Sequence, residues 1–124
     1  MRAKHIFDPC WSASVWLVWP ATNATLDAFI KRQFGIDEKT KDGGFLGRSV
    51  EITDNGGDEI STVIALAGWR GSPRDHATLA HECLHAAHNI LSRRGVPFDE
   101  HTDECYCYLM DSLVRRCLEI LKSK

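Results

Sequence analysis

Two histidines and a glutamate form the group of residues best suited to do chemistry. They occur as His81-Glu82-Cys83-Leu84-His85, a complete HExxH pattern. On a helix, the imidazoles of His81 and His85 share one face with about 5–6 Å between Cβ atoms, so both can bind one tetrahedral zinc ion at about 2.0–2.1 Å. The Glu82 carboxylate is rotated away from the pair, so it can act instead as the base that takes a proton from a zinc-bound water.

A helix with clear start and stop signals is predicted around this motif. Ser72 suits the N-cap, Pro73 the first helical position and Asp75 the first turn. Apolar residues recur at helical spacing through the motif as far as about Arg94, and Gly95 ends the segment. We therefore expect one long helix to carry both histidines and the glutamate.

A catalytic zinc site needs a third protein ligand and an open position for water. A second helix, predicted over Asp103–Lys122, supplies candidates because a short connection containing Pro97 folds it back against the first. Glu104 lies in its first turn, which in such a hairpin faces the middle of the metal-binding helix, and we favour it as the third ligand. The alternatives are His101, Asp103 and Glu100.

A strand and a helix are predicted near the N-terminus. Ser14–Trp19 is rich in β-prone and aromatic residues and is closed by Pro20, which indicates a buried strand. Thr22 or Asn23 can cap a helix whose apolar residues recur at i, i+3, i+4 and i+8, and Gly35 ends it.

Two further strands are predicted between this first helix and the HExxH helix. Phe45–Thr53 and Ile60–Trp69 are separated by the turn signal Asp54-Asn55-Gly56-Gly57, so they should form a hairpin. If the second of these strands is an exposed edge beside the metal, its backbone over residues 65–68 can pair with an extended peptide.

Length, charge and cysteine usage restrict the class of protein. A chain of 124 residues is the size of one domain, so we expect a single domain over residues 1–124. The net charge is −2 and basic residues are dispersed, which argues against nucleic-acid binding. The apolar stretch Cys10–Trp19 is too short to span a membrane, and Asp8-Pro9 interrupts any signal-peptide pattern. Five cysteines without CxxC spacing indicate reduced thiols, so we expect a cytoplasmic protein.

The segment from about residue 60 to residue 122 resembles a known class of enzyme. The HExxH motif followed by a helical hairpin and Glu104 is similar to the gluzincin zinc metallopeptidases, whose third ligand is a glutamate on the next helix. More closely, residues 78–87, 94–96, 103–104 and 108–109 resemble small phage- or prophage-encoded HExxH proteins generally called metallopeptidases. The resemblance implies a minimal zincin-like α+β fold, in which a short β-sheet packs on an active-site helix and an antiparallel third-ligand helix. It also implies Glu104 as a ligand of Zn²⁺.

Two residues mark departures from the related subclasses. His88 and Leu91 occupy the positions where metzincins have a glycine and a third histidine, so that subclass is disfavoured. His88 can contact substrate or a carboxylate, or it can be an ordinary exposed helical histidine. Tyr108 stands where larger gluzincins carry an acidic residue that orients a histidine. Its hydroxyl can hydrogen-bond an imidazole, or donate to a substrate carbonyl as a catalytic group, or the residue can simply pack.

The leading functional prediction is zinc-dependent hydrolysis of a peptide or protein substrate, with Glu82 activating the water. Two alternatives remain open: a noncatalytic metal-binding protein, such as a phage factor that binds a host protein, and a zinc amidase acting on a non-peptide bond. A fourth coordination position closed by His88 or His101 alongside Glu104 would favour the noncatalytic alternative. The sequence indicates neither the substrate nor the oligomeric state.

Overall fold

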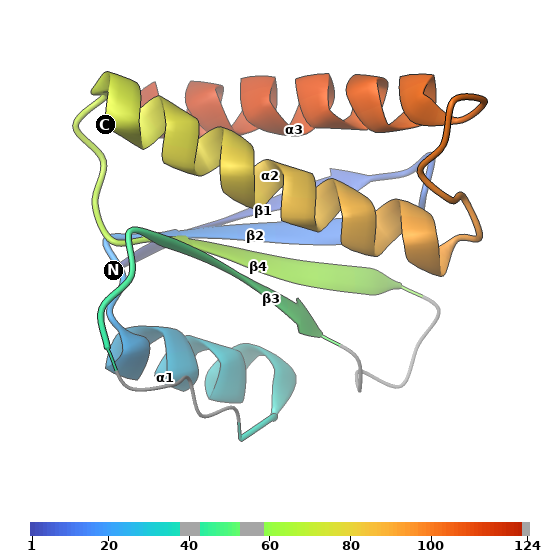
Figure 1. The fold of residues 1–124 in the computed structure, drawn as a ribbon. Helices are drawn as coiled ribbons and strands as arrows, with labels where there is room; N and C mark the ends of the chain where they lie inside the picture. Colours follow the sequence, from blue (N-terminus) through green and yellow to red (C-terminus); the bar gives the residue numbers. More distant parts are fainter. Residues whose placement is uncertain (38–42, 53–58, 123–124) are drawn as a thin grey trace.

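A computed structural model of the chain describes residues 1–37, 43–52 and 59–122, which form an α+β fold with a mixed sheet and three helices (Figure 1). The strands are β1 (Arg2–Asp8), β2 (Ala13–Trp19), β3 (Gly47–Ile52) and β4 (Ile60–Leu66). The helices are α1 (Asn23–Phe34), α2 (Pro73–Arg93) and α3 (Asp103–Lys122).

The four strands are arranged in the order β1-β2-β4-β3. The two central strands, β2 and β4, run parallel, and each edge strand is antiparallel to its neighbour. Helices cover both faces of the sheet, which explains why almost every residue of β2 and β4 is buried and why both strands are nearly continuously apolar.

α2 and α3 lie side by side on one face of the sheet, and α1 lies on the other (Figure 1). Because side chains alternate along a strand, each face has its own core. The larger core joins Leu17 and Ile64 of the sheet to Leu79 of α2 and Leu113 of α3. α2 contacts β4 and the edge strand β3, whereas α3 lies toward the opposite edge, where Arg116 donates a hydrogen bond to the carbonyl of Phe7 in β1. The HExxH helix is therefore the one beside β3.

The helix boundaries agree with the signals in the sequence. Thr22 caps α1, which ends at Gly35 in a left-handed conformation (φ 71°) that favours glycine. Ser72 and Asp75 form a reciprocal capping box at the start of α2, and α3 begins at Asp103 as predicted. None of the described helices combines the length and the apolarity that crossing a membrane requires.

The strands agree with the sequence only in part. The antiparallel pairing of β3 with β4 confirms the predicted hairpin, although its turn at residues 54–57 lies outside the described residues. The prediction that the second of these strands is an exposed edge is wrong, because β2 pairs in parallel along the other side of β4. β3 is the edge instead. β1 was not predicted, because only Ile6 among its residues is buried and the strand shows little apolar alternation.

Candidate active site

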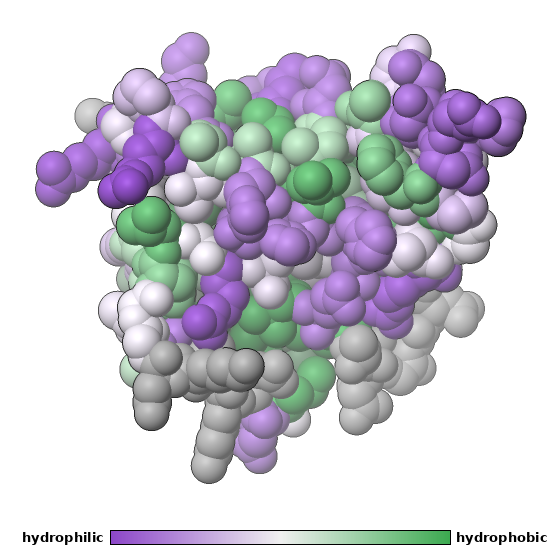
Figure 2. Space-filling view, in the orientation of Figure 1, coloured by the Kyte–Doolittle hydropathy of each residue, from purple (hydrophilic) through white to green (hydrophobic). Residues whose placement is uncertain are grey.

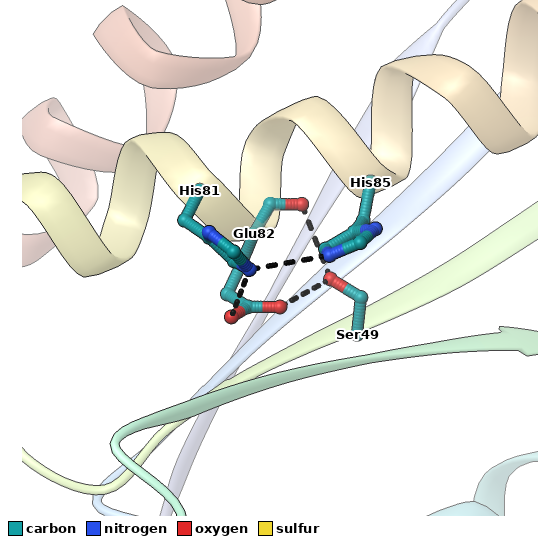
Figure 3. A network of polar contacts seen from close by, with 4 residues as sticks. All are labelled: Ser49, His81, Glu82 and His85. Atoms are coloured by element: carbon teal, nitrogen blue, oxygen red, sulfur yellow. Dashed lines mark hydrogen bonds and ion pairs between the residues drawn. The ribbon is translucent and has the colours of Figure 1, made fainter.

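The two histidines of the HExxH motif point the same way from neighbouring turns of α2 (Figure 3). The Nε2 atoms of His81 and His85 are 3.3 Å apart, and their ring centroids are 4.9 Å apart. Both residues are exposed, with 68% of the His81 side chain accessible to solvent. Figure 2 shows hydrophilic side chains across the middle of the face over which α2 runs in Figure 1. Both imidazoles are therefore accessible to a ligand from solution.

The spacing of these nitrogens fits a shared zinc ion. Two nitrogens bound at about 2.0–2.1 Å to a tetrahedral ion are separated by about 3.3–3.4 Å, which follows from the tetrahedral angle. The 3.3 Å between the Nε2 atoms of His81 and His85 equals that separation, so the distance between the two nitrogens is compatible with one shared zinc ion. The same distance also permits one ring to donate a hydrogen bond to the other.

The carboxylate of Glu82 is buried between α2 and β3. Only 7% of its side chain is accessible, and Ser49 of β3 lies with its hydroxyl oxygen 2.9 Å from Oε1 and 3.1 Å from the Glu82 carbonyl oxygen. The other carboxylate oxygen, Oε2, lies on the side of His81, at 4.0 Å from its Nε2 (Figure 3). A buried carboxylate is costly unless it accepts hydrogen bonds, so the Ser49 hydroxyl compensates part of the burial of Glu82.

A glycine allows β3 to approach this carboxylate closely. A Cβ atom built on Gly47 would lie 2.6 Å from Cγ2 of Thr78 and 2.9 Å from Cγ of Glu82, both within the range that real Cβ atoms essentially never show. Any larger residue at this position must therefore displace the strand or the side chains of Thr78 and Glu82.

The residues of β3 that face α2 are the part of the site that the sequence analysis missed. Gly47, Ser49 and Glu51 alternate along the strand, and all three line a hollow of about 290 Å³ together with His81 and His85. A period-two pattern of small and polar residues within a predicted strand was the available signal. Nothing in the sequence showed that this face of the strand packs against the HExxH helix.

A second hollow adjoins the first along the N-terminal half of α2. Its volume is about 460 Å³, and it shares Gly47, His81 and Glu82 with the first. Leu46 and Arg74 also line it, so it offers an exposed apolar side chain and a guanidinium in the same hollow as His81. Glu82 thus lines both hollows.

The predicted third ligand, Glu104, does not lie beside this pair. It is exposed in the first turn of α3, and two residues later the Tyr106 ring packs near His88 and Phe98, so this turn lies beside the C-terminal part of α2. Within residues 1–37, 43–52 and 59–122, no three His, Cys, Asp or Glu side chains are grouped closely enough to hold a metal ion. Ligation by Glu104 therefore remains a prediction that this geometry does not support.

Glu104 lies away from the two histidines because α3 packs against a different side of α2 from the one that carries them. Cys83 and Cys117 of α3 belong to the same buried core, whereas His81 and His85 line a hollow with residues of β3. Two residues along a helix rotate the side chain by about 200°, so the histidines and the α3 contact are on nearly opposite sides. The Cys117 thiol, together with burial, raises the pKa of Cys83 well above its usual range, which keeps this neighbour of Glu82 protonated.

The other candidate residues also lie away from the pair. Tyr108 is 72% exposed on α3 and lines neither hollow beside Glu82. His101 pairs with Glu100 at 3.5 Å in the exposed connection before α3, and Asp103 is exposed at the first position of that helix. The structure thus brings together His81, Glu82 and His85 among the predicted site residues, and adds Gly47, Ser49 and Glu51 from β3.

Comparison with known proteins leaves the site to be interpreted from its own geometry. No protein-family model matches the chain, and neither the curated proteins nor the solved structures include a significant match.

Proposed function

We propose that the chain is a zinc-dependent hydrolase, and specifically a metallopeptidase, in which His81 and His85 bind the metal and Glu82 is the base. The observation that carries this proposal is the separation of 3.3 Å between the two Nε2 atoms, next to a buried carboxylate held by Ser49. Two imidazoles and an adjacent, oriented carboxylate are the donor and base types that hydrolytic zinc sites use.

The two oxygens of Glu82 have different roles in this mechanism. Zinc, when bound, supplies the Lewis acidity that makes a water molecule nucleophilic near neutral pH. Oε1 is occupied by the Ser49 hydroxyl, whereas Oε2 lies on the side of His81. Oε2 is thus the oxygen placed to accept the proton of the attacking water, and the same carboxyl group then returns that proton to the departing amine nitrogen.

The edge strand β3 supports a peptide as the substrate. Among the described strands, β3 pairs with β4 alone, so its outer edge presents backbone groups beside the hollow that contains His81 and His85. An extended peptide that adds to this edge by main-chain hydrogen bonds passes next to Glu82. β3 thus takes the role that the sequence suggested for the backbone over residues 65–68 of the strand Ile60–Trp69.

A noncatalytic metal-binding protein is the second candidate. The observation that favours it is the lack of a third donor already grouped with His81 and His85 in the described part of the chain. A zinc amidase acting on a non-peptide bond would use the same residues as the peptidase. The main proposal also includes a relationship to the phage-encoded gluzincin-like proteins. The position of α3 adds no support to that relationship.

Metal analysis of purified variants tests the proposal. We expect about one zinc per wild-type chain, loss of that zinc in His85→Ala, and retention in the matched control His88→Ala, which changes another exposed histidine of α2. Glu82→Gln should keep the zinc and lose hydrolysis of a pool of quenched-fluorescent peptides. Unchanged zinc in His85→Ala would refute the ligand assignment, and full activity in Glu82→Gln would refute the base. One zinc per chain with no hydrolysis of any peptide would favour the noncatalytic candidate.

A further inference from the structure

We propose that Glu51 of β3, rather than a residue of α3, is the third protein ligand of the metal. This inference rests on the proposed zinc site and adds a ligand to it. The site is then assembled from two elements that already face each other, the helix α2 and the edge strand β3.

The pairing of β3 with β4 places Glu51 on the side of α2. Glu51 is opposite Thr62 in the antiparallel register, and residues directly opposite each other project to the same face of a sheet. Thr62 points to α2, because its hydroxyl accepts a hydrogen bond of 2.7 Å from the Asn89 side chain. Glu51 therefore projects toward α2 as well.

Measured along the axis of α2, Glu51 lies at the same height as His85, the second histidine of the motif. Ser49, two residues before Glu51, contacts Glu82, and Thr62, the partner of Glu51, contacts Asn89. Glu51 thus lies between the levels of residues 82 and 89. His85 lies midway between those levels, and Glu51 and His85 line the same hollow of about 290 Å³.

The chemistry of the three side chains suits zinc. Two histidines with one carboxylate are a donor set of catalytic zinc sites, with a fourth position left for water. Glu51 is exposed and has a flexible side chain, so its carboxylate can adopt other rotamers within the hollow that it shares with His81 and His85. The described donors are not yet grouped for binding, and Glu104 lies on α3, the helix whose Cys117 packs in the same core as Cys83 on the other flank of α2.

Ligation by Glu51 has a structural consequence. It would bridge β3 to α2 through the ion, in the hollow that Glu51 shares with His81 and His85. The adjoining hollow, lined by Leu46 and Arg74, would then be left for side chains of a substrate that runs along β3.

Zinc affinity of the metal-free protein, measured by competition with a chromophoric chelator, tests the inference without any substrate. We expect Glu51→Gln to weaken Zn²⁺ binding by at least about 100-fold, because even the loss of a group that only orients a ligand costs about 10–100-fold. The matched control Glu104→Gln, another exposed glutamate, should stay within about twofold of wild type. Glu51→His, which restores a zinc-binding side chain, should recover most of the affinity.

Cobalt substitution gives a second readout. The visible absorption of bound Co²⁺ reports its coordination, so we expect Glu51→Gln to change that spectrum and Glu104→Gln to leave it unchanged. Weakened binding in Glu104→Gln with wild-type affinity in Glu51→Gln would overturn the inference and support the helix ligand. Wild-type protein that binds no Zn²⁺ would overturn the zinc site itself, which is a different result from a site that ignores Glu51. Circular dichroism of each variant confirms that the fold is retained.

Discussion

The hydrogen bond between Ser49 and Glu82 is the contact whose removal tests the site geometry most directly. Ser49→Ala deletes the hydroxyl that lies 2.9 Å from Oε1 of Glu82. A hydrogen bond to a charged group contributes about 1.5–3 kcal/mol. Because only 7% of the Glu82 side chain is accessible, water replaces the lost donor poorly, and we expect the free energy of unfolding to fall by about 2–3 kcal/mol, the upper part of that range.

The expected change is large enough to measure by thermal unfolding. An unfolding entropy of about 2.1 cal/mol/K per residue makes 1 kcal/mol equivalent to about 4 °C for a chain of this length, so Ser49→Ala should lower Tm by about 8–12 °C. The assay is unfolding of the metal-free protein, followed by circular dichroism with heat and with urea. Ser49→Thr is the matched control, because it keeps the hydroxyl.

A double-mutant cycle identifies the acceptor. The Ser49 hydroxyl also lies 3.1 Å from the Glu82 carbonyl oxygen, and a bond to that oxygen would not depend on the side-chain charge. In a Glu82→Gln background, the cost of Ser49→Ala should fall to about 0.5–1.5 kcal/mol, the value for a neutral pair. An equal cost in both backgrounds would assign the bond to the carbonyl. A change below about 0.5 kcal/mol in the wild-type background would refute the contact altogether.

Three further predictions concern the surroundings of the site. Gly47→Ala should lower the free energy of unfolding by about 1–3 kcal/mol, because the added Cβ overlaps side chains of α2. A urea-unfolding midpoint equal to that of wild type would contradict the close approach of β3 to α2. Ser72→Ala should lower it by about 1 kcal/mol by removing the N-cap of α2, measured by the same unfolding assay, and no change would mean that the cap is not formed in solution. Cys83 and Cys117 are fully buried, and the raised pKa of Cys83 keeps its thiol protonated. A thiol reagent at pH 8 should therefore leave both cysteines unmodified until urea unfolds the chain. Rapid labelling of either cysteine in the native protein, located by mass spectrometry, would show that the α2–α3 contact opens.

The sequence determined what lies within single elements. The capping residues and the helical periodicity fixed α2 and α3 to within a residue or two of their observed ends. The pairing of His81 with His85 follows from one helical turn, and so does the rotation of Glu82 away from them. These relations needed no knowledge of the fold, because the geometry of a helix sets them locally.

Only the tertiary structure decided which elements meet at the site. The position of β4 between β2 and β3 made β3 the edge, and this brought Gly47 and Ser49 against Glu82. The flank on which α3 packs kept Glu104 away from the histidines. Strand order and the rotation of a helix about its axis result from many weak apolar contacts distributed over the whole core. No short stretch of sequence encodes that sum, so the pairing of His81 with His85 could be predicted from the chain, whereas its partners from the sheet could not.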